Sequence, residues 1–321
     1  MKFGRGFVQR LKMIQQSQAR EVHKMESTLL KAKTSRLEIA YASWGDRNGL
    51  PVVFVHGFPD SPVGWEAVVD CLGEGDVNAI APFGCGFGST RRLDEQSPKY
   101  GRIAVRAFDL IEFVDALGLD RFILVGHDIG ALAAQSATIL LRERVVGLVS
   151  LFEYGVSFQA AVGKLTPENL HALWYQWFFN LPWSNYAFKS DYKNICEYLW
   201  RQWSPQWQFQ PGEFESTATA FENSDFVDTV INGYRSDASL AKLDVKQFSE
   251  FEKQLTSGPV VPVSTTVIVG DADGLASPRP PEEEFFPNGY KRVILKGVGH
   301  FAHRESPLQV ADEILEHIKN F

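Results

Sequence analysis

An aspartate stands at the centre of the segment Val125–Ala131, which reads Val-Gly-His-Asp-Ile-Gly-Ala. The apolar run Phe122–Val125 precedes Asp128 and a helix-compatible run, residues 131–141, follows it, so the segment predicts a strand-to-helix turn. A carboxylate at such a turn could attack an sp3 carbon that bears a leaving group and form an ordinary ester, whereas attack on an ester or amide would give an anhydride. Epoxides and alkyl halides contain such a carbon. A simpler interpretation is that Asp128 only caps the helix, because aspartate is a favoured N-cap residue.

This turn resembles that of the aspartate-nucleophile α/β-hydrolases, which include soluble epoxide hydrolases, haloalkane dehalogenases and fluoroacetate dehalogenases. Two later motifs, Gly270–Asp273 and Gly297–Phe301, each follow a predicted strand, and they stand in the family order of nucleophile, acid and histidine. The resemblance implies that Asp273 is the acid and His300 the base. The weaker alternatives for these two roles are Asp271 and His303.

The segment His56–Pro59 resembles the His-Gly-x-Pro loop of the same family, although in isolation it would read as a tight turn. The resemblance implies that the backbone N–H groups of Phe58 and Ile129 face a developing oxyanion. It also implies a mechanism in which Asp128 forms a covalent ester and His300 activates the water that hydrolyses it. No metal or organic cofactor is expected for this chemistry.

Two further segments resemble the parts of epoxide hydrolases that protonate the epoxide oxygen. Residues 175–180 (Tyr-Gln-Trp-Phe-Phe-Asn) and 232–235 (Asn-Gly-Tyr-Arg) imply that Tyr175 and Tyr234 open the ring, because an alkoxide leaves poorly without a proton or a strong hydrogen bond. The alternative is that both tyrosines are structural and bond to the backbone. The side chains expected to line the substrate pocket are His56, Trp177, Phe178 and Phe301.

Departures from the family patterns reduce the number of reactions that the resemblance leaves open. Halide-binding dehalogenases usually carry tryptophan after the nucleophile and often asparagine in the oxyanion loop, where Ile129 and Phe58 stand here. Fluoroacetate dehalogenases carry arginine and histidine where Ile129 and Gln176 stand, so a small anionic substrate is disfavoured. The leading hypothesis is an epoxide hydrolase that converts an apolar epoxide to a vicinal diol. The alternatives are a hydrolytic haloalkane dehalogenase acting on an alkyl halide and a non-catalytic binding protein of the same fold.

The elements that position these groups are indicated by apolar runs that alternate with helical patterns. This alternation predicts an α/β-hydrolase fold with a mostly parallel central sheet flanked by helices. Predicted strands cover residues 36–44, 52–56, 77–82, 145–151, 265–269 and 292–295, and a predicted helix covers 103–117. Six of the eight tryptophans lie in residues 154–257, which favours an inserted helical lid. The core is then 26–153 and 258–321, and the resemblance covers 34–319. Residues 1–25 predict a basic amphipathic helix that docks on the body, contacts a partner or membrane surface, or directs transport to an organelle.

Composition excludes several other classes of protein. The net charge of −7 and the pI of about 5.6 disfavour nucleic-acid binding. The glycine-rich stretch 84–90 does not have the spacing of a dinucleotide-binding motif. Cys71, Cys85 and Cys196 are scattered, so free thiols in a reducing, cytoplasmic setting are expected. No apolar run approaches the ~20 residues of a membrane span, and the sequence leaves a homodimer open.

Overall fold

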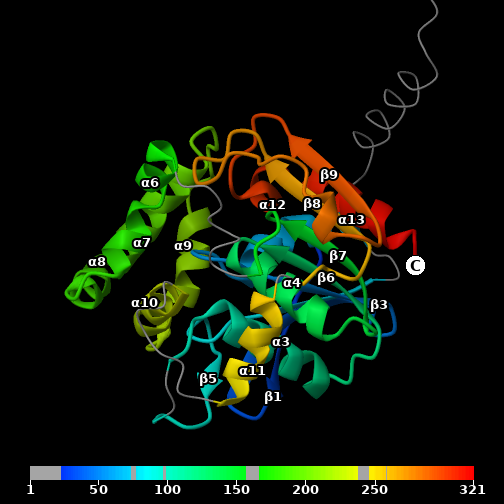
Figure 1. Cartoon of the computed structure of the whole chain (residues 1–321), viewed down its shortest axis with the longest axis horizontal. Helices are drawn as coiled ribbons and strands as arrows, with labels where there is room; N and C mark the ends of the chain where they lie inside the picture. The colour runs from blue at the N-terminus through cyan, green and yellow to red at the C-terminus, as the bar shows by residue number, and fades with distance from the viewer. Residues whose placement is uncertain (1–22, 74–76, 97–98, 157–165, 238–245, 258) are drawn as a thin grey trace, which may run out of the picture.

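A computed structural model describes residues 23–321 except 74–76, 97–98, 157–165, 238–245 and 258. Its central feature is a mixed sheet with the strand order β1-β2-β4-β3-β6-β7-β8-β9 (Figure 1). The strands are β1 (Thr28–Lys33), β2 (Leu37–Gly45), β3 (Leu50–Val55), β4 (Val77–Pro82), β6 (Phe122–His127), β7 (Val145–Leu151), β8 (Thr265–Gly270) and β9 (Tyr290–Leu295), and the short β5 (Arg91–Arg92) pairs with β2. From β4 to β9 all neighbours along this order are parallel, whereas β2 is antiparallel to both β1 and β4.

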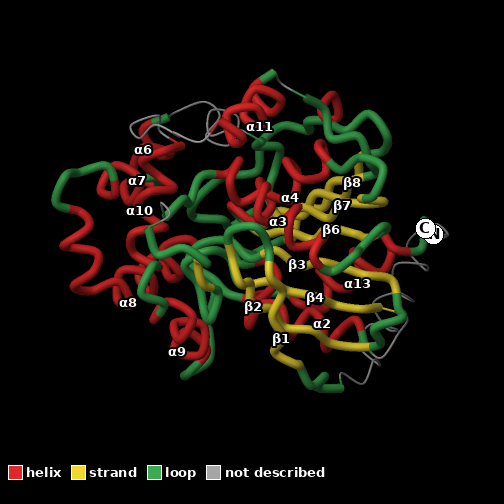
Figure 2. Tube along the Cα trace, turned by 90° about the horizontal axis from the view of Figure 1, so that it is seen from below, coloured by secondary structure: helices red, strands yellow, loops and turns green. Residues whose placement is uncertain are grey.

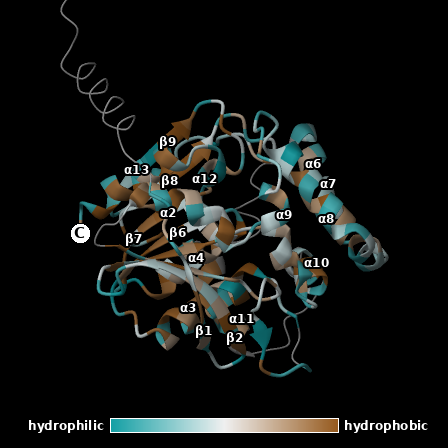
Figure 3. Ribbon diagram, turned by 180° about the vertical axis from the view of Figure 1, so that it is seen from behind, coloured by the Kyte–Doolittle hydropathy of each residue, from teal (hydrophilic) through white to brown (hydrophobic). Residues whose placement is uncertain are grey.

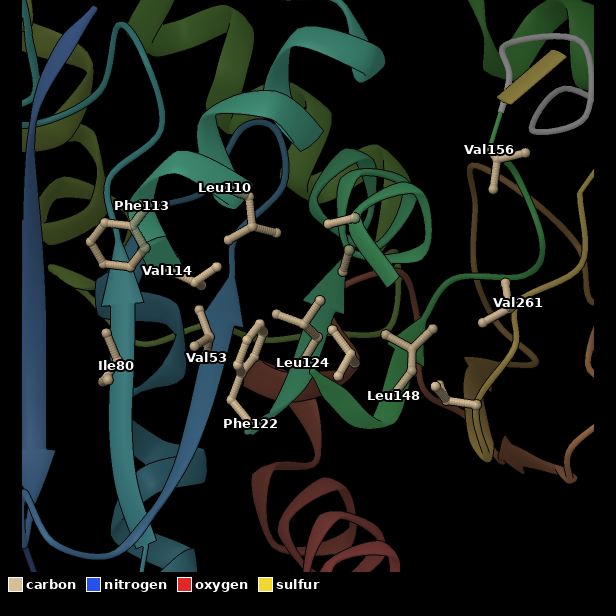
Figure 4. Close-up of a cluster of buried hydrophobic side chains, with 14 of the residues drawn as sticks. Val53, Ile80, Leu110, Phe113, Val114, Phe122, Leu124, Leu148, Val156 and Val261 are labelled. Atoms are coloured by element: carbon tan, nitrogen blue, oxygen red, sulfur yellow. The ribbon is translucent and has the colours of Figure 1, made fainter. Parts of the chain in front are cut away.

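Helices cover both faces of the sheet (Figure 2). The core helices are α2 (Glu66–Leu72), α3 (Ile103–Ala116), α4 (Ile129–Leu140), α12 (Ala302–Glu305) and α13 (Pro307–Ile318), with a 3-10 turn η1 at Pro62–Trp65. Because successive strand residues point to opposite faces, Val53 packs toward α3 and α4 whereas Val52 and Phe54 pack toward α2 and α13. Figure 4 shows the first of these layers, in which Phe113 of α3 lies with Val53 and other strand residues. Both layers fix the carboxyl ends of the parallel strands, where the candidate site lies.

Every secondary-structure element that the structure describes between β7 and β8 is a helix. Its elements are α6 (Pro167–Ala172), α7 (Trp174–Phe179), α8 (Ser184–Trp203), α9 (Glu213–Ala218), the 3-10 turn η2 (Thr219–Glu222), α10 (Phe226–Asp237) and α11 (Lys246–Thr256). Helices α6 to α10 lie to one side of the hydrophobic strands β6 to β8 (Figures 1 and 3). By contrast, α11 packs on α3 of the core, with Phe248 against Tyr100 and Phe108. We therefore use the word lid for α6 to α10.

The predicted fold class is confirmed. Strands β4 and β7 have their predicted bounds, and α4 begins two residues earlier than the helical pattern indicated. Strand β1 was not predicted, because it lies at the edge of the sheet and is mostly exposed, so its pattern lacks a continuous apolar run. Most of the predicted helix over residues 1–25 lies outside the described residues. None of the helices that the structure describes is long and apolar enough to cross a membrane.

Candidate active site

Asp128 lies at the turn between β6 and α4, as the motif predicts. It is the one non-glycine residue with a positive φ in the described chain, with φ 54° and ψ −130°. Such a backbone costs about 1–3 kcal/mol and persists where the surroundings enforce it. Here they do so by close packing, because a Cβ at Gly130 would lie 2.4 Å from the backbone oxygen of His56 and one at Gly126 would lie 2.6 Å from Cα of Ala131. The Asp128 side chain makes no capping hydrogen bond to α4, so helix capping does not explain its position.

The loop after β3 supplies a backbone donor to this carboxylate. The Phe58 N–H donates to Oδ1 of Asp128 at 2.9 Å, and a cis peptide bond joins Phe58 to Pro59. Gly57 leaves room for this contact, because a Cβ there would lie 2.5 Å from Cβ of Asp128. Ile129 is the first residue of α4, so its amide belongs to the N-terminal turn of that helix. The loop therefore holds the Phe58 N–H against Asp128.

His56 supports this loop from within the core. Its Nδ1 lies 2.9 Å from the carbonyl oxygen of Gly57, and its Nε2 accepts a hydrogen bond from the Gly84 N–H at 3.1 Å. Burial lowers the pKa of His56 to about 4, so the ring is neutral and Nδ1 carries the proton that it donates. Both nitrogens are thus engaged with backbone groups, so the geometry gives His56 a role in supporting this loop.

His300 lies between two carboxylates. Its Nδ1 is 2.9 Å from Oδ2 of Asp273 and its Nε2 is 3.5 Å from Oδ2 of Asp128. Burial acts against the charged ring, but the carboxylates of Asp273 and Asp128 outweigh it and raise the pKa of His300 to about 10. Asp271, the weaker alternative acid, instead accepts a hydrogen bond from the Gly297 N–H. The structure therefore brings together Asp128, Asp273 and His300.

The C-terminal end of α8 holds the two loops that carry Asp273 and His300. The carbonyl oxygen of Trp203 accepts hydrogen bonds from the N–H groups of Gly274 and His300, at 2.9 and 3.2 Å. Its neighbour Ser204 donates to Oε1 of Glu305 at 2.6 Å, and the two Glu305 oxygens also accept from the N–H groups of Gly299 and Phe301. Ser204 and Glu305 were missed in the sequence, because contacts between residues 101 positions apart leave no local motif.

The two predicted lid tyrosines lie side by side above the loop. The ring centroids of Tyr175 in α7 and Tyr234 in α10 are 5.3 Å apart, and the Tyr234 ring lies 5.8 Å from that of Phe58. Burial, with the nearby charge of Asp128 as a further cause, raises the pKa of both hydroxyls, so both are protonated at neutral pH. The Tyr175 oxygen accepts a hydrogen bond from Nε2 of Gln176 at 3.0 Å. This bond leaves the Tyr175 proton free for another acceptor.

The other three predicted pocket residues differ in where they lie. Trp177 is 44% exposed on the outer side of α7, since its buried neighbours Tyr175, Gln176 and Phe179 occupy the inner side of that helix. Phe178 is partly buried against other lid rings, and Phe301 is buried against His300 and Trp203. A cavity of about 700 Å³ reaches the candidate acid and base from the ends of β7 and β8. Its lining includes Phe152, Glu153, Asp273, Arg279 and His300, and none of the four predicted pocket residues.

A buried group beneath the site has residue types that bind metals. Asp60, His127 and His303 place one potential ligand atom each within 4.8 Å of one another. Both carboxylate oxygens of Asp60 are already engaged, because Oδ1 pairs with Arg304 at 2.5 Å and Oδ2 with Nε2 of His303 at 2.7 Å. A metal ion would have to displace a guanidinium from a buried ion pair, so the donor set fits a structural ion pair better than a metal centre.

Comparison with known proteins identifies the family of the chain. The sequence profile described as the alpha/beta hydrolase family matches residues 52–313. Epoxide hydrolases 2 and 1 of Siraitia grosvenorii are each 26% identical to the chain, over 94% and 90% of its length and 100% and 97% of theirs. The crystal structure of a putative epoxide hydrolase from Klebsiella pneumoniae superimposes with a TM-score of 0.85 and 29% identity, covering 91% of this chain and 97% of that one.

The chain therefore belongs to the alpha/beta hydrolase family. Within it, the protein is a hydrolase that is similar to epoxide hydrolases.

Proposed function

We propose that the protein opens an apolar epoxide to a vicinal diol through a covalent ester at Asp128. The observation that carries this proposal is a pair of protonated tyrosines, Tyr175 buried and Tyr234 partly buried, whose rings lie 5.3 Å apart. The Tyr234 ring also lies 5.8 Å from that of Phe58, whose N–H contacts Asp128. A carboxylate and two hydroxyl donors in one buried site suit a substrate that takes a nucleophile at carbon and a proton at oxygen. A halide leaving group needs no such proton.

In the first half-reaction an oxygen of Asp128 attacks one epoxide carbon, and the carbon–oxygen bond of the ring breaks. Tyr175 or Tyr234 transfers its proton to the departing oxygen, which leaves a tyrosinate and a hydroxyalkyl ester. The Gln176 amide that donates to the Tyr175 oxygen at 3.0 Å orients the tyrosine proton away from itself and stabilises the tyrosinate. Gln176 is thus a positioning residue in this proposal.

In the second half-reaction His300 acts as a general base. While Asp128 is ionised, the raised pKa of His300 keeps the ring protonated. Esterification removes the Asp128 charge, so the pKa of His300 falls and the ring passes its proton to the tyrosinate. The neutral imidazole can then take a proton from water. The resulting hydroxide attacks the carboxyl carbon of the ester, and the Phe58 N–H, already 2.9 Å from that carboxyl group, stabilises the oxyanion. Collapse breaks the ester bond, and the departing diol oxygen takes the proton of the carboxyl group just formed. Asp128 is then again ionised beside a protonated His300.

The test separates epoxide from halide chemistry by following alkylation of Asp128. In rapid-quench single turnovers, mass spectrometry of the Asp128 peptide would report the reaction with styrene oxide and with 1-bromobutane. We expect Tyr175→Phe and Tyr234→Phe to slow alkylation by the epoxide ~10²-fold each, the range for loss of one positioned acid. The rate with the bromoalkane should change much less.

Tyr192→Phe is the matched control, because Tyr192 is a lid tyrosine that packs on Phe188 and Phe226. It should leave both rates unchanged. Epoxide alkylation at the normal rate in both Tyr175→Phe and Tyr234→Phe would exclude the assigned ring-opening role. Reaction with the bromoalkane alone would identify a haloalkane dehalogenase.

A further inference from the structure

Trp203 presents a buried hydrogen-bond donor that has no acceptor in the described part of the chain. The side chain ends helix α8 and is 0% exposed, and no described residue accepts a hydrogen bond from its Nε1. Its ring centroid lies 5.2 Å from that of His300, 5.0 Å from that of Tyr175 and 6.4 Å from that of Phe58. The indole therefore contacts the candidate base, one candidate acid and the oxyanion loop.

Neighbouring lid tryptophans differ from Trp203, because their indole N–H groups have acceptors. Trp200 donates from Nε1 to the carbonyl oxygen of Pro59 at 2.7 Å, Trp174 donates to Oε1 of Gln202 at 2.8 Å, and the more exposed Trp177 donates to a backbone oxygen. A buried donor without an acceptor is destabilising, so such groups in native proteins usually serve water or a ligand. The position of Trp203 beside His300 and Tyr175 favours a ligand of the active site.

We propose that the indole N–H of Trp203 donates a hydrogen bond to the epoxide oxygen. The same oxygen becomes a hydroxyl of the diol product, and the indole keeps its hydrogen bond to that hydroxyl. The inference rests on the proposed function, since the diol is its product. The indole is a donor without acceptor capacity, so it recognises an oxygen lone pair and takes no part in proton transfer. Ile129 next to the nucleophile offers no side-chain donor, and Trp203 supplies one from the lid. Trp203 is thereby a specificity residue for an oxygen-bearing substrate.

The indole N–H signal gives a readout that does not depend on turnover. The full-length protein labelled with ¹⁵N at the tryptophan indoles would be titrated with 1-phenylethane-1,2-diol, with binding measured separately by calorimetry. Trp203→Phe assigns the resonance by its disappearance. We expect the Trp203 indole proton to move downfield and to saturate with the calorimetric Kd. Trp203→Phe, which keeps an aromatic ring but loses the N–H, should weaken diol binding about tenfold, as for one lost hydrogen bond.

Trp65 provides the matched control, because it is also 0% exposed and its Nε1 also has no acceptor among the described residues. It packs on Phe54 and His303 beneath the loop, so its resonance should stay in place and Trp65→Phe should bind the diol normally. An unmoved Trp203 resonance in the diol complex, or absence of diol binding, overturns the proposal. A shift with bromide but not with the diol does so as well. Failure to turn over epoxides while the diol still shifts Trp203 would refute the proposed reaction and leave this contact standing.

Discussion

Replacing Asp128 by asparagine should convert His300 into a group with a near-neutral pKa. The His300 side chain is 1% exposed, and its Nε2 lies 3.5 Å from the Asp128 carboxylate, which is itself buried. Asparagine has nearly the same size and removes the charge, as formation of the ester does. Asp128→Asn thus mimics the electrostatics of the proposed covalent intermediate, while the second carboxylate, Asp273, stays at 2.9 Å from Nδ1.

The size of the effect follows from the distance. Two unit charges 3.5 Å apart attract by about 4 to 5 kcal/mol in an effective dielectric of about 20, which corresponds to a change of about 3 in the pKa of His300. The pKa that the two carboxylates raise to about 10 in the resting protein should therefore fall to about 7 in Asp128→Asn. A base with that pKa is neutral for a large fraction of molecules at physiological pH, so the ester would activate the histidine that hydrolyses it.

The assay is ¹H–¹⁵N correlation spectroscopy of the imidazole nitrogens between pH 5 and 10.5, with His300→Gln to identify the signals. Asp271→Asn is the matched control, because Asp271 lies on the Asp273 loop and bonds to the Gly297 N–H instead of to His300. It should leave the His300 titration unchanged. Equal pKa values in wild type and Asp128→Asn would refute the electrostatic coupling, and with it the account of how the base is activated.

His300→Gln should stop only the second half-reaction, since Asp128 needs no base to attack. Intact-protein mass spectrometry after incubation with styrene oxide should then show the mass of the bound substrate. Normal turnover with no added mass would remove His300 from the mechanism. Stability should fall in mild acid because burial lowers the pKa values of His56 and His317 to about 4. As the pH falls, these two histidines take up protons in the unfolded chain before they do so in the folded protein. Their contribution to the free energy of unfolding is therefore complete above pH ~6.5 and is lost as the pH falls toward 4. Between pH 7 and 5, the free energy of unfolding measured in urea should fall by about 2 kcal/mol less in His317→Gln than in wild type. An equal fall in wild type and His317→Gln would contradict this.

Local patterns predicted those parts of the site that depend on neighbouring residues. Asp128 and His300 were found because each stands in a glycine motif directly after an apolar strand, and close packing at Gly130 shows why glycine is needed there. The prediction for Trp177 placed it in the pocket because a lid motif contains it, but the short helix α7 has one buried side and this residue lies on the other. Which side faces the core depends on the packing of α7 against the rest of the lid, and the six residues of α7 do not contain that information.

Residues that join distant parts of the chain could not be predicted in this way. Trp203 resembled the other lid tryptophans in sequence. Only the structure shows that Trp200 and Trp174 have acceptors, whereas Trp203 has none among the described residues. His56 stood in a recognisable motif, yet its role became apparent from a hydrogen bond to Gly84, 28 residues away. Tertiary contacts decide whether a buried polar group has a hydrogen-bond partner. A sequence therefore indicates candidate donors and leaves their partners open.

The distribution of these groups explains why core and lid must fold together for the proposed reaction. The core fixes the candidate nucleophile, through the strained turn at Asp128 and the Phe58 N–H that contacts it. The lid contributes the tyrosine hydroxyls, and its helix α8 also positions the acid and base through the Trp203 carbonyl. A Cβ at Gly274 would lie 2.2 Å from the Gln202 oxygen, and one at Gly299 would lie 2.6 Å from Cα of Ser204, so the approach of α8 to both loops requires glycine. Any displacement of this end of α8 would therefore disturb ring opening and ester hydrolysis together, because one short segment supports the groups that serve both steps.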